Sequence, residues 1–208
     1  RHIANVRVRN VGTVGGNLAF ADPHSDLATL FLALGASVEL VSPRGRRELT
    51  LAEFVRGPWE TARAADELLT SVRLAPWPAG TAAAFVKFGV HERPTLGIAV
   101  ALRLDGSRAG RARVVDARVA IGCVNPCPAR APGAEARLTG IALAELEDVA
   151  GEAAALAAAS ADTADDLHGS ADYKREMVAV FVRRALRAAA ARARGVAPVA
   201  GFPHAIIA

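Results

Sequence analysis

Three closely spaced glycines are the residues of this chain that point most clearly to a chemical role. Gly12, Gly15 and Gly16 lie within the stretch Arg7-Val8-Arg9-Asn10-Val11-Gly12-Thr13-Val14-Gly15-Gly16-Asn17-Leu18. Because glycine has no Cβ, this backbone can adopt positive φ angles and let a ligand approach closely. Successive N–H groups in such a loop form a concave site for an anion. The stretch therefore predicts a loop around a phosphate group.

Two common phosphate-binding patterns do not fit this stretch. A P-loop requires Gly-Lys-Ser/Thr, and a dinucleotide-binding fold requires the spacing G-x-G-x-x-G. The anion would be held instead by backbone amides and by the side chains of Thr13 and Asn17, without a lysine. Taken alone, the glycines also fit a tight turn between two strands.

The glycine stretch and the run after it, Ala21-Asp22-Pro23-His24-Ser25-Asp26, together resemble a known motif. It is the second flavin-binding motif of the FAD-carrying subunits of molybdenum hydroxylases, the family of xanthine dehydrogenase and of the carbon monoxide dehydrogenase medium subunit. In that family an Ile-Arg-Asn-x-Gly-Thr-Ile-Gly-Gly-Asn segment wraps the FAD pyrophosphate, and an Asp-Pro-x-x-Asp segment follows. The resemblance implies FAD as the cofactor.

The resemblance extends to residue 190. Four later segments match family landmarks: 65–74, which ends the flavin domain; 85–94, which carries a lysine; 134–140; and 170–186. It implies an α+β fold, in which the second lobe of a PCMH-type FAD-binding domain precedes a carbon monoxide dehydrogenase flavoprotein C-terminal-like domain, a three-stranded antiparallel sheet with helices. We place the FAD-binding part at residues 1–78, the C-terminal domain at 79–195 and a tail at 196–208.

The resemblance also implies which residues hold the cofactor. Residues Thr13, Val14, Gly15, Gly16 and Asn17 would cradle the pyrophosphate, and Asp26 would accept a hydrogen bond from a sugar hydroxyl. Leu69 would form an apolar wall at the flavin, and Lys87 would lie beside the ring. The alternatives are a favourable charge at a helix N-terminus for Asp26, ordinary strand core for Leu69 and a surface lysine for Lys87. We expect no catalytic side chain and no metal ligand in this chain.

Family subunits carry a first flavin subdomain, with its own Gly-Gly loop, ahead of the matched region. Here the sequence opens on Arg1-His2-Ile3. We expect either that the sequence is a fragment or that the first subdomain lies on another chain, and FAD affinity would then be reduced.

Composition narrows the class of protein. With 52% hydrophobic residues the chain is globular, and no apolar stretch approaches the roughly 20 residues of a membrane span. The net charge is +4, but aromatic residues make up only 5%, so stacking platforms for nucleic acid are scarce.

Cys123 and Cys127 lack a second pair for a metal or cluster, which favours reduced thiols in a cytoplasmic protein. The cluster of Asp162, Asp165, Asp166 and His168 favours a capped loop over a metal site.

Hydrophobic spacing predicts the remaining elements. Asp22 would cap a helix that begins at Pro23 and ends at Gly35, and Thr50 with Glu53 would form a capping box. We expect strands at 37–42, 47–51, 68–74, 83–90, 97–104 and 112–124, and long helices at 143–159 and 173–193.

The expected function is electron transfer through FAD. By resemblance, a large subunit would carry a molybdenum cofactor and a small subunit would carry [2Fe–2S] clusters, in a hetero-oligomer without nucleic acid or membrane insertion. FAD would pass the electrons to NAD⁺, a quinone or another acceptor. The alternatives are a flavoenzyme of the same fold that oxidises its substrate directly, and an assembly scaffold that has lost flavin.

Overall fold

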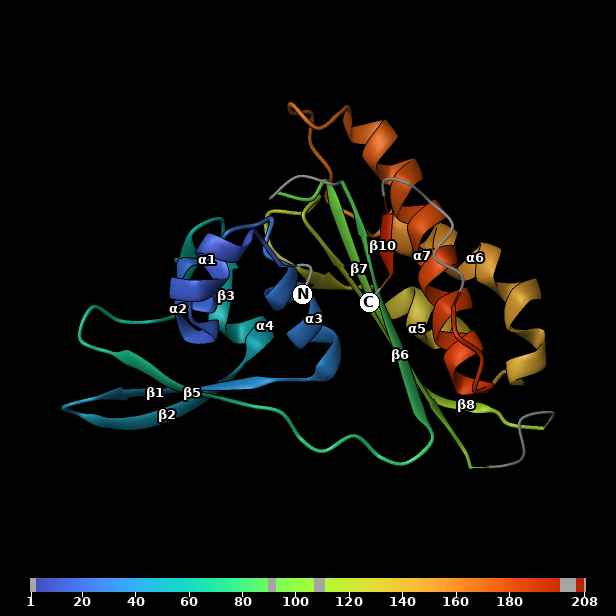
Figure 1. Cartoon of the computed structure of the whole chain (residues 1–208), viewed down its shortest axis with the longest axis horizontal. Coiled ribbons are helices and arrows are strands. Elements are labelled where there is room, and N and C mark those ends of the chain that lie inside the picture. The colour runs from blue at the N-terminus through green and yellow to red at the C-terminus, as the bar shows by residue number, and fades with distance from the viewer. Residues whose placement is uncertain (1–2, 90–92, 107–110, 199–204, 208) are drawn as a thin grey trace.

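The computed structural model describes residues 3–89, 93–106, 111–198 and 205–207. Figure 1 shows two lobes side by side, one of short helices and a small sheet, the other a larger sheet backed by long helices. The mixed composition of both lobes confirms the expected α+β fold class.

In its described residues, the N-terminal lobe contains four helices and five strands. The helices are α1 (Val6–Val11), α2 (Val14–Phe20), α3 (Asp26–Leu34) and α4 (Leu51–Phe54), and the strands are β1 (Ser37–Ser42), β2 (Gly45–Thr50), β3 (Val55–Gly57), β4 (Glu60–Thr61) and β5 (Leu68–Arg73). Strand β1 pairs antiparallel with both β2 and β5, so β5 forms one edge of a three-stranded sheet. The capping box at the start of α4 is present as predicted.

The C-terminal lobe is a five-stranded antiparallel sheet with helices. Its strands are β6 (Thr81–Phe88), β7 (Leu96–Leu104), β8 (Val114–Gly122), β9 (Ala129–Arg130) and β10 (Ala205–Ile207), in the order β10-β6-β7-β8-β9. The helices are α5 (Pro132–Leu138), the 3₁₀ helix η1 (Leu143–Glu145), α6 (Leu146–Ala159) and α7 (Ala171–Ala193). The three predicted strands form β6, β7 and β8, although predicted residue 90 lies outside the described ranges. The short β9 and β10 extend the sheet at its two edges.

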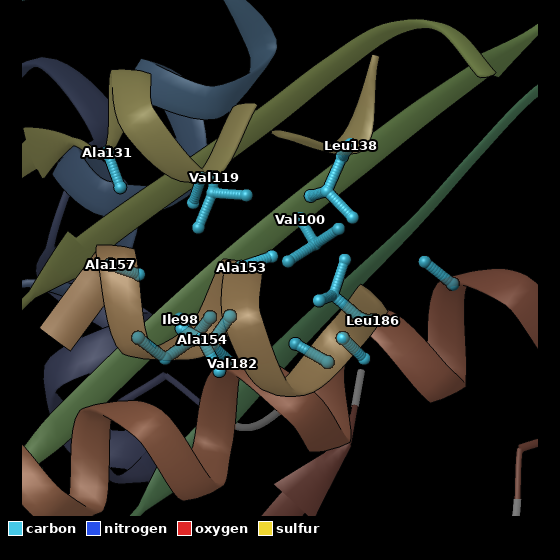
Figure 2. Close-up of a cluster of buried hydrophobic side chains, with 14 of the residues drawn as sticks. Ile98, Val100, Val119, Ala131, Leu138, Ala153, Ala154, Ala157, Val182 and Leu186 are labelled. Carbon is cyan, nitrogen blue, oxygen red and sulfur yellow. The ribbon is translucent and has the colours of Figure 1, made fainter. Parts of the chain in front are cut away.

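The larger sheet separates two hydrophobic cores. Because successive side chains of a strand point to opposite faces, Ile98, Val100 and Val119 face the helices, as Figure 2 shows. Ala99 and Ala120 face the N-terminal lobe. The small residues on this second face let α3 lie directly against the sheet, and a Cβ built on Gly122 would stand only 1.8 Å from Thr29 Oγ1 of α3.

Two local expectations are wrong. The glycine stretch is not a loop with positive φ angles, because Gly15 and Gly16 lie inside helix α2 and neither has a positive φ. Asp22 does not cap α3: Ser25 is the N-cap residue, and the Asp22 carboxylate accepts a hydrogen bond from His24 N instead. That side-chain turn uses Asp22 and delays the helix start by three residues.

Cys123 and Cys127 are both free, as the sequence predicted. Within the described ranges, every helix is too short or too polar to cross a membrane.

Candidate functional site

Helix α2 begins at the glycine stretch with its first N–H groups available. Thr13 is the N-cap residue, and its Oγ1 accepts a hydrogen bond from Gly16 N at 2.9 Å. The N–H groups of Val14 and Gly15 have no acceptor among the described residues, as expected at the start of a helix. The side chain of Thr13 is thus engaged within the protein, while two backbone donors remain for a ligand.

A groove of about 540 Å³ lies beside these donors. Thr13, Val14 and Gly15 form one side of it, and residues 69–72 of the edge strand β5 form much of the other. A Cβ on Gly15 would lie 3.4 Å from Leu69 Cδ2, which is van der Waals contact, so α2 and β5 lie close together here. Ser71 Oγ is buried and has no hydrogen-bond partner in the described part of the chain. The groove therefore combines an apolar wall with polar groups that still lack partners.

Asn17 connects α2 to the start of α3. Its Oδ1 accepts a hydrogen bond from Ser25 Oγ at 2.6 Å, and the Ser25 side chain makes no cap hydrogen bond to its own helix. Asn17 therefore holds the two helix starts together rather than presenting its carbonyl oxygen to a ligand.

Asp26 and Lys87 form a buried ion pair across the two lobes. Lys87 Nζ lies 2.8 Å from Asp26 Oδ2, and the residues are 4% and 8% exposed. Burial raises the pKa of Asp26 above its usual value of 3.8, while the hydrogen bond and the charge of Lys87 oppose that rise. Asp26 Oδ1, the other carboxylate oxygen, is buried without a partner among the residues that the structure describes.

A largely apolar cavity of about 230 Å³ adjoins this ion pair. It lies between α3 and the small-residue face of β6 and β7, and Ile206 of β10 contributes to its wall. Asp26 lines this cavity, and its Oδ1 is a buried hydrogen-bond acceptor without a partner among the described residues. A buried carboxylate oxygen in that position is costly unless a donor reaches it.

The structure thus brings the predicted residues together in two groups. Thr13, Val14, Gly15 and Leu69 line the groove, while Asp26 and Lys87 line the cavity and pair with each other. Gly16 supports the cap of α2, and Asn17 joins α2 to α3. The surface-lysine alternative for Lys87 is wrong, because its side chain is buried.

Sequence reasoning missed two features of the site. Ser25 precedes a helix and could have been read as its N-cap from residue type alone. The Ser71 hydroxyl, which has no hydrogen-bond partner among the described residues, could not have been identified from residue type, because its surroundings depend on the pairing of β5 with β1.

Comparison with known proteins identifies two domains in the chain. The FAD binding domain in molybdopterin dehydrogenase matches residues 1–77, and the CO dehydrogenase flavoprotein C-terminal domain matches residues 90–189. Both agree with the resemblance expected from the sequence, which is thereby confirmed.

Individual relatives agree with this assignment. The nicotine 6-hydroxylase medium subunit of Paenarthrobacter nicotinovorans is 36% identical over 193 residues, which is 92% of this chain and 65% of the relative. The carbon monoxide dehydrogenase medium chain of Afipia carboxidovorans is 34% identical over 194 residues, again 92% and 65%.

Solved structures share the fold. The crystal structure of the cyanide-inactivated Cu,Mo-CO dehydrogenase matches with a TM-score of 0.83 at 35% identity, covering 92% of this chain and 65% of that one. Quinoline 2-oxidoreductase from Pseudomonas putida 86 matches with a TM-score of 0.82 at 31% identity, covering 93% and 65%. The chain therefore spans 65% of the length of these relatives.

Proposed function

Because the two domains of this chain are those of the FAD-binding medium subunits of molybdenum hydroxylases, we propose that it holds FAD in an oxidoreductase complex. Its task would be to receive electrons from [2Fe–2S] clusters on a partner subunit and to pass them to an acceptor. When bound, the flavin supplies the electron-transfer chemistry, and the protein supplies binding, orientation and electrostatic tuning.

The observation that carries this proposal is the set of buried polar atoms that lack partners. Asp26, which lines the cavity, and Ser71, which lines the groove, each carry a buried oxygen, Oδ1 and Oγ, that is unpaired within the described ranges. FAD carries hydroxyl groups that could donate to a carboxylate and phosphates that accept from N–H groups. The hydrogen-bonding groups of FAD therefore match those of the residues that line the groove and the cavity.

Each residue of the site has a distinct part in the proposed binding. The N–H groups of Val14 and Gly15 would donate to the pyrophosphate, and Asp26 Oδ1 would accept from a sugar hydroxyl. Leu69 would supply the apolar wall. Lys87 would hold its positive charge near the ring while its ion pair with Asp26 fixes the position of the ammonium group.

The partners belong to the same proposal. The relatives named above are medium subunits or medium chains, which supports a hetero-oligomer with a molybdenum-cofactor large subunit and a [2Fe–2S] small subunit. We include a cytoplasmic location in the proposal. Affinity purification of this protein from its native cells, followed by metal analysis, tests the partners: molybdenum and iron in the isolated complex support them, and their absence contradicts them.

FAD binding can be tested by titration, following the quenching of flavin fluorescence. We expect weak but saturable binding, since the chain spans 65% of its relatives. Gly15→Val would fill the groove next to Leu69, and Asp26→Asn would weaken the acceptor in the cavity. Each change should weaken binding roughly tenfold or more, equivalent to about 1.4 kcal/mol.

Gly151→Val is the matched control. Gly151 also lies in a helix, α6, but a Cβ there meets nothing within 4 Å, so this variant should bind FAD like the wild type. Wild-type affinity in both Gly15→Val and Asp26→Asn would contradict the site assignment. Absence of saturable FAD binding by the wild-type chain would contradict the proposal that these residues hold FAD.

A further inference from the structure

Two histidines meet where the lobes join, outside the groove and the cavity. His24, in the segment between α2 and α3, and His168, in the segment before α7, have ring centroids 5.0 Å apart with an angle of 46° between the rings. Both side chains are partly buried. The contact joins residues that are 144 positions apart, and nothing in the proposed binding of FAD uses it.

The His24 side is fixed by the segment that follows β6. The His24 Nδ1 atom lies 2.8 Å from the carbonyl oxygen of Pro94; because that oxygen can only accept, Nδ1 is the donor. Next to it, Asp22 Oδ2 lies 2.9 Å from Arg93 Nη2, while Asp22 Oδ1 accepts from His24 N. The segment at 22–24 is thus attached to residues 93–94 of the C-terminal lobe.

The His168 side is fixed by helix α7. Asp166 Oδ1 accepts from His168 N at 2.7 Å and lies 2.6 Å from Lys174 Nζ. Lys174 is only 2% exposed and also donates to the Ala164 carbonyl at 2.8 Å. The ring of His168 is therefore presented to His24 by a loop that a buried lysine anchors.

The charges around the two rings are already matched. Asp22 pairs with Arg93, Asp166 with Lys174, and the deeper Asp26 with Lys87. Asp165 accepts from Ala171 N, at the first residue of α7. Asp166 attracts a positive charge on His168, but it also pairs with Lys174, as Asp22 pairs with Arg93. Among the described residues, these cations balance the carboxylates beside the rings, so two imidazolium rings with centroids 5.0 Å apart would repel each other.

We propose that His24 and His168 form a proton-sensitive latch between the two lobes, closed while the imidazoles are neutral and opened when both are protonated. Histidine is the side chain whose charge ordinarily changes between about pH 5 and pH 8. Opening would release the loop at 163–170 from the segment at 22–24, which leads directly into Asp26. The latch would thereby control how firmly the start of α3 is held against the C-terminal lobe.

Hydrogen exchange measured by mass spectrometry tests the latch in the full chain. Exchange of the 163–170 region is compared at about pH 7.5 and about pH 5.5, corrected for the intrinsic chemical rate and with EDTA present so that no metal bridges the rings. For the wild type we expect protection to fall roughly tenfold at the lower pH. His24→Gln and His168→Gln should each reduce that change to less than about twofold.

Leu167→Gln is the control in the same loop. Leu167 is fully exposed beside His168, so this variant should keep the wild-type pH response. A role limited to packing predicts equal loss of protection at both pH values in the histidine variants. That result would overturn the proposal. So would a wild-type loop whose exchange is insensitive to pH, or a pH response that survives in the double variant His24→Gln/His168→Gln.

Discussion

The Asp26–Lys87 pair depends on both of its members because it lies almost out of contact with water. Its separation of 2.8 Å and the burial of both side chains mean that neither charge is solvated. Breaking a buried pair from one side is more damaging than replacing both partners, since it leaves one uncompensated charge. This asymmetry gives a test that does not require FAD.

We expect Lys87→Met to lower the free energy of unfolding by about 3 kcal/mol at neutral pH. The pKa of Asp26 is already raised by burial, and loss of the opposing lysine raises it further. A raised pKa means that the folded state binds the proton more tightly than the unfolded state, so this carboxyl contributes more stability as pH falls. The defect of Lys87→Met should therefore shrink between pH 7 and pH 5 in urea unfolding experiments.

The double variant Asp26→Asn/Lys87→Met is the control for that interpretation. It removes both charges, so its loss of stability at neutral pH should be smaller than that of Lys87→Met alone. If the double variant is as unstable as the single one, the damage comes from lost packing rather than from an unpaired carboxylate.

Helix α2 is short and depends on its cap. It has seven residues, and Thr13 supplies the side-chain acceptor for Gly16 N. We expect Thr13→Ala to lower the free energy of unfolding by about 1 kcal/mol and to speed amide exchange at Gly16. Thr13→Ser keeps the hydroxyl and should behave nearly like the wild type; equal losses in both variants would show that the methyl group, not the cap, matters.

An ion pair attaches the β1–β2 hairpin to the segment before β5. Arg47 Nε and Nη2 each lie 2.7 Å from an oxygen of Glu67, and Ala64 N donates to the same carboxylate. The hydrogen bonds from Arg47 and Ala64 lower the pKa of Glu67 from 4.5 to about 2. A carboxyl with a lowered folded-state pKa stabilises the fold above its unfolded pKa and loses that contribution as pH falls through the folded value.

Glu67→Gln should therefore be less stable than the wild type at neutral pH. The difference in urea midpoint should narrow as pH falls from 4.5 toward 2, the interval between the unfolded and folded pKa values. Glu48→Gln, on the neighbouring exposed face of β2, is the control and should show a smaller effect. A difference for Glu67→Gln that is constant with pH would remove the ion pair as its cause.

The sequence predicted those elements whose side chains follow a regular period. Helices α3, α6 and α7 and strands β1, β5, β6, β7 and β8 were expected close to their observed bounds. The glycine stretch was misjudged because glycine is a poor helix former, yet Thr13 caps a helix there. Strand β10 was missed because three residues carry too little pattern.

The candidate site was predicted as individual residues but not as contacts. Resemblance selected Asp26 and Lys87 separately, with one at a sugar and the other at the ring. Their ion pair joins residues 61 positions apart and exists only because α3 lies on the face of the sheet that carries Lys87. Long-range packing of this kind leaves no signal in local spacing.

At the scale of the whole molecule, the two lobes are joined through the close contact of α3 with the large sheet. Gly122 of β8 and Thr29 of α3 meet there, and Thr29 Oγ1 is buried without a partner among the described residues. Arg118 adds a hydrogen bond to the Ala33 carbonyl at the other end of the helix. The geometry of the cavity beside Lys87 therefore depends on the absence of a side chain at position 122.

Gly122→Ala should push α3 away from the sheet, because the new Cβ would lie 1.8 Å from Thr29 Oγ1 and 2.9 Å from Thr29 Cβ. We expect a loss of roughly 3 kcal/mol in the free energy of unfolding, with faster amide exchange in α3 than in α6 and α7. Thr29→Ala removes the nearer atom and an unpaired hydroxyl, so adding it to Gly122→Ala should recover part of the loss. Gly151→Ala, where a Cβ meets nothing within 4 Å, should instead gain about 0.5 kcal/mol as a glycine replaced within a helix. If Gly122→Ala is as stable as the wild type and leaves exchange in α3 unchanged, the lobes are not held together by this contact.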